Sequence, residues 1–431
     1  MPFPRPGRSL VLLMRKQLNF RSADHIQALL DLSIDIHLVT LDREGAAGDP
    51  RFASCLPLAD DSTEQEALAA VVEVARSRRA AAVITFAEVD IVITGMANEQ
   101  LGVPWAHSIA DQVSRDKARQ REFLSSRGLP SVWHYVVADA DAAIAAAAAR
   151  GLPLIVKPTR AASSSHVELV GDIGRLADAL AGIERLALSR SRGYYDEMPE
   201  HWALIEEYLP GREVTLDGVV IDGEFLLGGV CDKRVSAGPY FEEDLYTFPM
   251  AEPAREPELA ALAASITRHL GVTGTLFNAE FREDADGRFR VVEFSTRISG
   301  GHVYRNIKDV HRIDLVRIFA RMACGDPVKD ILLQENQRMP ARMTTCNKVI
   351  FGTGTVVRNS AGETVHSPYF RAYYPMARPG ERVAAAPLGF DTVGTLSVRA
   401  RWQDGQSAAE VHAVAEELAA SLDIEVLPDD S

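Results

Sequence analysis

The chain has 431 residues, of which 47% are hydrophobic, and its 60 Asp and Glu against 46 Lys and Arg give a formal net charge of -14. This length and composition predict roughly three soluble globular domains with large cores. The acidic balance disfavours a sequence-independent grip on nucleic acid or on an anionic membrane, because both need a basic protein surface. Chemistry on small molecules is the expected class of function.

Cysteine spacing and the N-terminal segment argue against two further classes. Cys55, Cys231, Cys324 and Cys346 form no Cys-x-x-Cys unit, so neither a zinc site nor a disulfide framework is predicted. The apolar stretch near the N-terminus is short and broken by charge, unlike a signal peptide, and no run approaches the length of a membrane span. We therefore expect a cytoplasmic protein with no membrane and no nucleic-acid partner.

Short apolar runs alternate with helical patterns through the first hundred residues. The runs 9–14, 34–41 and 81–86 are typical of strands, and the segments 22–32 and 64–79 have helical periodicity. This alternation predicts βαβ units in a parallel sheet. The segment carries no G-x-G-x-x-G pattern, so a dinucleotide is not expected there.

The next segment is predicted to be a helix followed by a small subdomain. A helix is expected from Asp111 to Arg127, ended by Gly128 and Pro130. The alanine-rich run 138–150 is predicted to be a helix, because alanine is the best helix former. The polar stretch 188–201 is expected to be a connection.

A strand over 152–158 is predicted to present a lysine to a cleft. Lys157 would stand at its end, because Pro158 blocks further ladder pairing, and its ammonium could then bind a phosphate. The small polar loop 162–166 could offer backbone N–H groups and hydroxyls to phosphate oxygens as a mobile lid.

Two strand ends complete this side of the predicted cleft. The segment 203–213 reads as a strand ending at Pro210-Gly211, so backbone groups of residues 206–209 would be free to pair with a ligand. A hairpin around Asp222-Gly223 then leads to Lys233.

Two carboxylates mark a candidate metal site. Glu280 and Glu293 occupy matching places on two strand-like runs joined by the turn 284–287. In such a hairpin they can lie side by side and converge on a hard cation, and Mg²⁺ suits this site better than a transition metal. Arg297 and the bend Gly300-Gly301 follow, which is typical of a place where negative charge develops. A surface hairpin with solvent-facing carboxylates is the alternative.

Six spaced blocks together resemble the ATP-grasp superfamily, over about residues 110 to 320. They contain Lys117, Lys157, the serine loop, the segment 203–220, Asp232-Lys233, and the pair 277–281 with 292–302. Two departures stand out. The loop is rich in serine where the family is usually richer in glycine, and Ser295 stands where the family usually has Asn.

The resemblance implies a multi-domain α/β fold of α+β character. Its parts would be a Rossmann-like pre-ATP-grasp domain at 1–112, a small ATP-grasp subdomain at 113–195, a large subdomain with the metal site at 196–324 and a β-rich C-terminal domain at 325–431.

The resemblance also implies the nucleotide contacts. ATP would contact Lys117, Lys157, Ser163, Ser164, Ser165, Glu206, Glu207, Tyr208, Leu209, Glu213 and Lys233. Glu206 and Leu209 would frame adenine, and Glu213 would bind the ribose hydroxyls. Mg²⁺, for which Mn²⁺ is an expected substitute, would be held by Glu280 and Glu293, with Ser295 contributing directly or through water.

For the chemistry, the resemblance points to the carboxylate-amine ligase branch and its L-amino acid ligases. Arg297, Gly300, Gly301 and His302 would be catalytic, and His302, Tyr304 and Arg305 would contact substrate. An amino acid carboxylate would be activated as an acyl phosphate and condensed with an amine, which is expected to be a second amino acid. Dimers are common in this family, so a homodimer is an expectation.

Three alternatives stay open. Biotin carboxylases share the Thr-Arg-Ile sequence, but their catalytic base falls on Gly301 here. A nucleotide-binding sensor of the same fold would lack ligation altogether. Arg297 could also form a salt bridge to Glu293 that shapes the hairpin, alone or together with a catalytic role.

Overall fold

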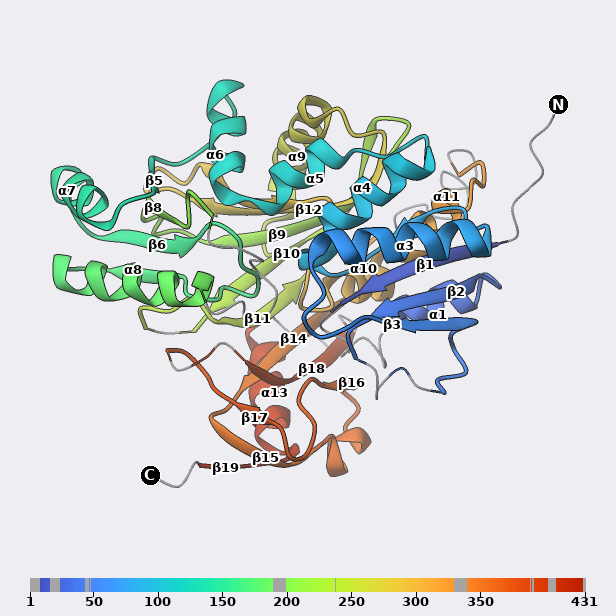
Figure 1. Ribbon diagram of the computed structural model, residues 1–431. Coiled ribbons are helices and arrows are strands. Elements are labelled where there is room, and N and C mark those ends of the chain that lie inside the picture. The colour runs from blue at the N-terminus through green and yellow to red at the C-terminus, as the bar shows by residue number, and fades with distance from the viewer. Residues whose placement is uncertain are drawn as a thin grey trace.

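A computed structural model of the protein describes most of the chain. The described residues are 8–15, 24–42, 46, 48–188, 199–236, 238–328, 339–387, 389, 391–401 and 408–428. Within them lie four β-sheets with helices packed around them (Figure 1). The fold is mixed α and β, as predicted.

The first sheet is parallel and belongs to the N-terminal part of the chain. Its strands lie in the order β3 (Ser54–Pro57), β2 (Asp35–Thr40), β1 (Ser9–Met14) and β4 (Val83–Ile84). The helical elements that accompany it are α1 (Asp24–Leu30), α3 (Glu64–Arg78), η2 (Glu88–Asp90) and α4 (Ile91–Leu101). The predicted βαβ alternation is confirmed. The edge strand β3 was not anticipated, because its largely exposed side chains leave no apolar pattern.

The helix expected from Asp111 to Arg127 is wrong in one respect, because two helices occupy this region. They are α5 (Ser108–Arg115) and α6 (Lys117–Ser126). Asp116 between them is extended, and its carboxylate accepts hydrogen bonds from Ala118 N and Arg119 N, which caps α6. The break places Lys117 in the first turn of α6.

A small antiparallel sheet follows, drawn at the left of Figure 1. Its order is β5 (His134–Val137), β8 (Ala203–Glu207), β6 (Leu154–Pro158) and β7 (Glu168–Val170), and its helices are α7 (Ala140–Arg150) and α8 (Ile173–Leu188). The predicted alanine-rich helix is α7. Pro158 does not stop ladder pairing, because it lies opposite Ala203 in β8; proline lacks the N–H but keeps a carbonyl acceptor.

The largest sheet is antiparallel and has eight strands within the described residues. Its order is β13 (Phe289–Ser295), β12 (Gly274–Glu283), β9 (Glu213–Ile221), β10 (Glu224–Val235), β11 (Glu243–Phe248), β14 (Met343–Phe351), β18 (Thr392–Arg401) and β16 (Phe370–Pro375). The helical elements along this part of the chain are η4 (Pro253–Arg255), α9 (Glu256–Leu270), α10 (Val303–His311) and α11 (Leu315–Ala323).

The C-terminal region is rich in strands and continues the large sheet, because β14 pairs with β11. Its other elements are η5 (Gly362–His366), β15 (Gly354–Ser360), β17 (Arg382–Val383), α13 (Ala408–Ala420) and β19 (Asp423–Leu427), with the order β17-β15-β19 in a small sheet. The expected division into four domains stays a prediction, and its boundary at 195/196 lies outside the described residues.

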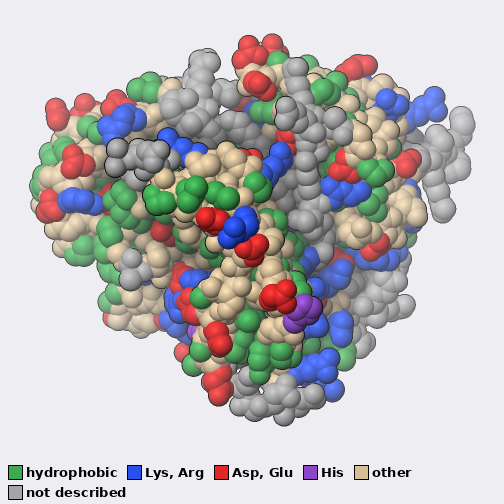
Figure 2. Space-filling model, turned by 90° about the horizontal axis from the view of Figure 1, so that it is seen from below, with side chains coloured by type: hydrophobic (Ala, Val, Ile, Leu, Met, Phe, Trp, Pro, Cys, Tyr) green, Lys and Arg blue, Asp and Glu red, His purple; other side chains and the backbone are tan. Residues whose placement is uncertain are grey.

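Two surface properties bear on partners. Across the described part of the face in Figure 2, acidic and basic side chains are intermingled instead of gathering into one basic patch. No helix among the described residues is long and apolar enough to cross a membrane.

Candidate active site

A cavity lies between the small sheet and the large sheet, with an empty volume of about 1180 Å³ that includes its open mouth. It collects most of the predicted site. The predicted residues that line it are Lys117, Lys157, Ser163, Ser164, Ser165, Glu206, Glu207, Tyr208, Leu209, Glu213, Lys233, Glu280, Glu293, Ser295, Arg297 and Gly300. Gly301, His302, Tyr304 and Arg305 are not among the described residues that line it.

The glutamate pair lies on one wall of the cavity, on the predicted hairpin. Glu280 in β12 and Glu293 in β13 are register partners in adjacent antiparallel strands. Glu293 Oε1 lies 2.8 Å from Lys117 Nζ, and Glu280 Oε2 lies 3.0 Å from Lys233 Nζ. The hairpin geometry expected from the sequence is therefore confirmed, and both carboxylates face the same cavity.

The charge around Glu280 favours a cation. Burial raises the pKa of Glu280 to about 7; Lys233 opposes this shift, and the carboxylates of Glu243, Glu213 and Glu293 add to it. Carboxylate oxygens are hard donors, but Lys233 and Lys117 already pair with these acids, and no group of three or more His, Cys, Asp or Glu in the described part of the chain is arranged to hold a metal ion. The glutamate pair therefore fits Mg²⁺ only together with further oxygen ligands, such as those of a phosphate.

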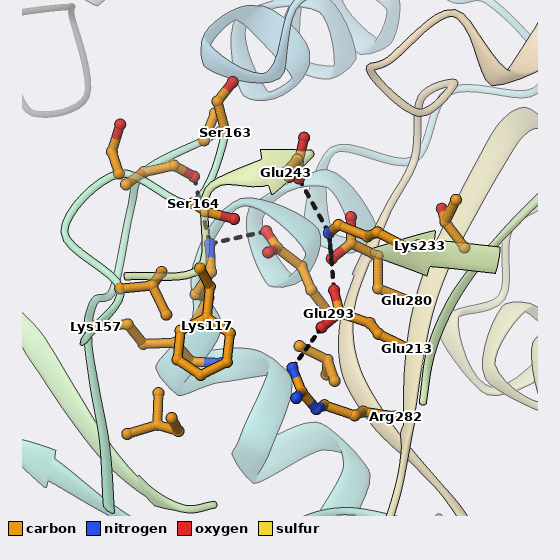
Figure 3. A pocket seen from close by; sticks show the side chains of 18 of the residues that line it. Lys117, Lys157, Ser163, Ser164, Glu213, Lys233, Glu243, Glu280, Arg282 and Glu293 are labelled. Atoms are coloured by element: carbon orange, nitrogen blue, oxygen red, sulfur yellow. Dashed lines mark hydrogen bonds and ion pairs between the residues drawn. The ribbon is translucent and has the colours of Figure 1, made fainter. Parts of the chain in front are cut away.

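Lys233 lies at the centre of three carboxylates (Figure 3). Its Nζ lies 2.8 Å from Glu213, 3.0 Å from Glu243 and 3.0 Å from Glu280. Burial alone would lower the pKa of Lys233, but the three acids outweigh burial and hold it well above its usual value. Arg282 forms a second ion pair with Glu213, at 2.9 Å. The ribose-binding role predicted for Glu213 would thus fall to a carboxylate already held by two cations.

Glu243 and Arg282 both line the cavity and were missed by sequence reasoning. A signal existed for Arg282, because it stands two positions after Glu280 and alternate residues of a strand share a face. Glu243 had none, since it lies in an ordinary acidic run.

The phosphate end of the predicted site combines two lysines with the serine loop. Lys117 Nζ also donates to Ala161 O at 3.3 Å, which ties α6 to the start of the loop. Ser163 and Ser164 have φ angles of 54° and 53°. This left-handed region is the one that glycine adopts most easily, so the serines hold the conformation expected of a glycine-rich loop.

At the predicted adenine end, the expectation that the backbone of residues 206–209 is free is partly wrong. Glu206 is paired on both sides, opposite His134 in β5 and Ile155 in β6. Glu207 N donates to Trp133 O at 3.1 Å. The backbone of Glu206 and Glu207 is engaged because β8 lies between two other strands. Tyr208 and Leu209 lie beyond the strand end.

Arg297 and Ser295 share one partner, the buried Glu88 of η2. Arg297 Nε and Ser295 Oγ both donate to Glu88 Oε2, the latter at 3.0 Å. The salt bridge considered from the sequence, to Glu293, is therefore replaced by one to Glu88. Burial opposes the charge on Arg297, but Glu88 and then Glu293 raise the pKa of its guanidinium. Sequence reasoning missed Glu88, which precedes the glutamate hairpin by about 190 positions.

Comparison with protein families identifies the central segment. Residues 150–305 match the family model described as the ATP-grasp domain. This chain contains an ATP-grasp domain. The match covers the site from Lys157 to Arg305, and it leaves Lys117 and Glu88 to the preceding part of the chain.

Two curated relatives match part of the chain at low identity. The chain is 24% identical to alanine–anticapsin ligase of Bacillus subtilis (strain 168) over 275 residues, which is 61% of this chain and 57% of that protein. It is 31% identical to D-alanine–D-alanine ligase of Stutzerimonas stutzeri (strain A1501) over 206 residues, 46% of this chain and 60% of that protein. The chain thus spans less than two thirds of the length of these curated relatives.

Solved structures extend the likeness of fold to nearly the whole chain. An L-amino acid ligase from Bacillus licheniformis matches with a TM-score of 0.80 at 20% identity, covering 99% of this chain and 100% of that one. The biotin carboxylase domain of 2-oxoglutarate carboxylase from Hydrogenobacter thermophilus matches with a TM-score of 0.71 at 16% identity, covering 97% and 90%. The arrangement of sheets around the ATP-grasp domain is therefore shared by these proteins.

The residues that follow Gly300 are packed against neighbouring side chains, with Gly301 and His302 partly buried. Gly301 has a φ of 62°, and a Cβ there would lie 2.5 Å from the Tyr246 ring, so only glycine fits. His302 stacks on Tyr374 with ring centroids 3.9 Å apart, and burial followed by Arg305 lowers its pKa to about 3. Tyr304 and Arg305 are buried in α10. The catalytic and substrate roles expected for these residues stay predictions.

Proposed function

We propose that the protein is an ATP-dependent ligase that joins the carboxylate of an amino acid to an amine, most simply that of a second amino acid. One observation carries the proposal: three lysines, a cross-strand glutamate pair and Arg297 line a single cavity. The names of two relatives support it, since one is a ligase of alanine and anticapsin and the other is a ligase of two D-alanines. The likeness of fold to an L-amino acid ligase agrees with it.

The nucleotide would lie along the cavity from Leu209 to the glutamate pair. Lys117, Lys157 and the serine loop suit the phosphates, because they combine ammonium groups with backbone N–H donors. Glu213 suits the ribose hydroxyls, and the residues beyond the end of β8 suit adenine.

Glu280 and Glu293 would hold Mg²⁺, with Ser295 as their neighbour. When bound, Mg²⁺ would neutralise negative charge on the phosphate oxygens during phosphoryl transfer. Ser295 Oγ donates a hydrogen bond to Glu88 and keeps lone pairs for a cation or a water. Mn²⁺ as a substitute stays a prediction.

The proposed reaction has two steps, phosphoryl transfer to a carboxylate and attack by an amine. A carboxylate oxygen of the first amino acid bonds to the γ-phosphorus of ATP, the bond to the bridging oxygen breaks, and ADP leaves. The amine nitrogen then bonds to the carbonyl carbon of the acyl phosphate, the carbon–oxygen bond to phosphate breaks, and the amine gives up a proton. The products are an amide, ADP and phosphate.

Arg297 would face the charge that develops in both steps. Its guanidinium is held by Glu88, so it is preorganised toward the acyl phosphate and the tetrahedral oxyanion. Gly300 lines the cavity beside it, and without a side chain its backbone leaves room for the substrate. Asp217 accepts a hydrogen bond from Ser299 N at 2.9 Å, which fixes the loop from Arg297 to Gly300.

The test is release of ADP and phosphate from Mg-ATP across a matrix of paired amino acids and amines, with product masses read for each responding pair. Release that needs two substrates, with a product lighter than their sum by one water, is the expected result. Nucleotide binding without turnover across the matrix would favour the sensor, and carboxylation of a substrate by bicarbonate would favour the carboxylase. Size-exclusion chromatography with light scattering would test the expected homodimer.

A further inference from the structure

Arg121 is a fully buried arginine that lines the cavity and that the proposed mechanism has not used. It lies one helical turn after Lys117 on α6, so both side chains leave the same face of the helix. Arg121 Nε donates to Glu206 Oε1 at 2.6 Å, and Nη2 donates to Val292 O at 2.6 Å. One guanidinium therefore joins strand β8 of the small sheet to strand β13, one position before Glu293.

Glu206 also holds Lys157. Its second oxygen, Oε2, lies 2.7 Å from Lys157 Nζ, and both side chains are almost fully buried. Burial would raise the pKa of Glu206, but Arg121 and Lys157 outweigh it and lower that pKa to about 2. As described, the ammonium expected to bind phosphate is engaged by a carboxylate.

Binding a phosphate requires Lys157 to turn away from Glu206, wholly or in part. A buried carboxylate left without a counter-charge is strongly unfavourable. Arg121 removes this obstacle, because it already bonds the other oxygen of Glu206 and stays in place when Lys157 leaves. Its Nη1 has no hydrogen-bond partner within the described structure, so the guanidinium has one further N–H donor beside the cavity.

We propose that Arg121 is a positioning residue for nucleotide binding. It neutralises Glu206, so that the Lys157 ammonium can leave this carboxylate and bind a phosphate. It also links β8 to the glutamate hairpin. This role rests on the proposed use of ATP. It predicts a dependence on phosphate: a ligand with phosphates needs Lys157 released, whereas adenosine alone does not.

The experiment measures binding of AMP-PNP with Mg²⁺, and of adenosine, to the full chain by calorimetry. R121Q is expected to weaken AMP-PNP binding by about tenfold or more, because Lys157 stays on Glu206. Adenosine binding should change by less than about threefold. R119Q is the matched control, since the side chain of the exposed Arg119 on the same helix bonds only Gln112 among the described contacts.

The double variant R121Q/E206Q separates this role from a merely structural one. Removing the carboxylate frees Lys157, so AMP-PNP binding should recover relative to R121Q. R121K keeps a charge beside Glu206 and should bind AMP-PNP better than R121Q. If R121Q does not fold, E206Q alone serves, and its affinity for AMP-PNP should weaken no more than its affinity for adenosine, because both ligands share any contact between Glu206 and adenine.

Four results would overturn the role of Arg121: unchanged AMP-PNP binding by R121Q, equal weakening of adenosine and AMP-PNP binding in R121Q, no recovery in R121Q/E206Q, or a larger loss of AMP-PNP than of adenosine affinity in E206Q. Each requires that the unmodified protein binds AMP-PNP. Failure of the unmodified protein to bind any adenine nucleotide would overturn the proposed function, and the role of Arg121 with it.

Discussion

Glu88 and Arg297 are 209 positions apart in the chain and form an ion pair beside the glutamate hairpin. Glu88 follows the parallel N-terminal sheet, whereas Arg297 follows β13 of the large sheet. The same Glu88 oxygen accepts a hydrogen bond from Ser295, so one carboxylate of the N-terminal region orients two residues next to the candidate metal site. The N-terminal region therefore contacts the proposed reaction centre through η2.

Changing Glu88 to Gln should lower turnover by about tenfold, because the neutral amide cannot hold the guanidinium with a charge-assisted hydrogen bond. Affinity for AMP-PNP with Mg²⁺ should stay within about threefold, since Glu88 is not among the residues that line the cavity. Steady-state kinetics and calorimetry on E88Q measure both, with the exposed Glu73 changed to Gln as the control. Equal loss in affinity and turnover would contradict an effect exerted through Arg297.

Changing Arg297 to Ala should reduce turnover by about 10²–10³-fold, the range for losing one donor to a developing oxyanion. ATP affinity should change much less, because the lysines and the serine loop remain. The measurement is kcat and KM for ATP once a substrate pair is known. R288A is the control, since Arg288 lies on the exposed turn of the same hairpin and pairs with Asp286. Unchanged turnover in R297A would remove Arg297 from the mechanism.

Changing Glu293 to Gln should raise the Mg²⁺ concentration needed for half-maximal activity by about tenfold or more, because an amide oxygen carries no charge and binds Mg²⁺ more weakly than a carboxylate. It should also loosen Lys117, which pairs with Glu293. Titration of activity with Mg²⁺ at saturating ATP gives the result. E258Q, at a half-exposed position on α9, is the control. An intact Mg²⁺ dependence would count against this metal site.

Asp217 should make stability depend on pH. Burial raises its pKa from 3.8 to about 6 in the folded protein, although hydrogen bonds from Ser299 oppose the shift. Because the folded state prefers the protonated form, the contribution of Asp217 to stability is complete below pH 4 and is lost as pH rises through 6. The loss amounts to about 3 kcal/mol.

D217N removes this titration. The difference in unfolding free energy between the unmodified protein and D217N should therefore shrink from pH 4 to pH 7, measured by urea denaturation at each pH. A difference that stays constant over this interval would show that Asp217 ionises normally in the folded state.

Local features of the sequence were sufficient for the parts of the site that lie on one hairpin or at one strand end. Glu280 and Glu293 flank a turn, so strand pairing alone brings them together, and the hairpin before Lys233 follows from Asp222-Gly223. The alternation of strands and helices likewise predicted the parallel N-terminal sheet, because side-chain periodicity is a local property. The break at Asp116 was missed, since an N-cap inside a continuous helical pattern is a weak signal.

The partners of those residues were decided only by the tertiary structure. Glu88 beside Arg297 and Arg121 beside Glu206 join elements that no periodicity relates, and each contact depends on how separate elements pack around one cavity. The sequence by itself determined which chemical groups the protein carries and on which strands they stand. Which carboxylate neutralises which cation was decided by the packing of the chain. A charge that folding removes from water needs a partner of opposite charge, and that partner can come from any part of the sequence.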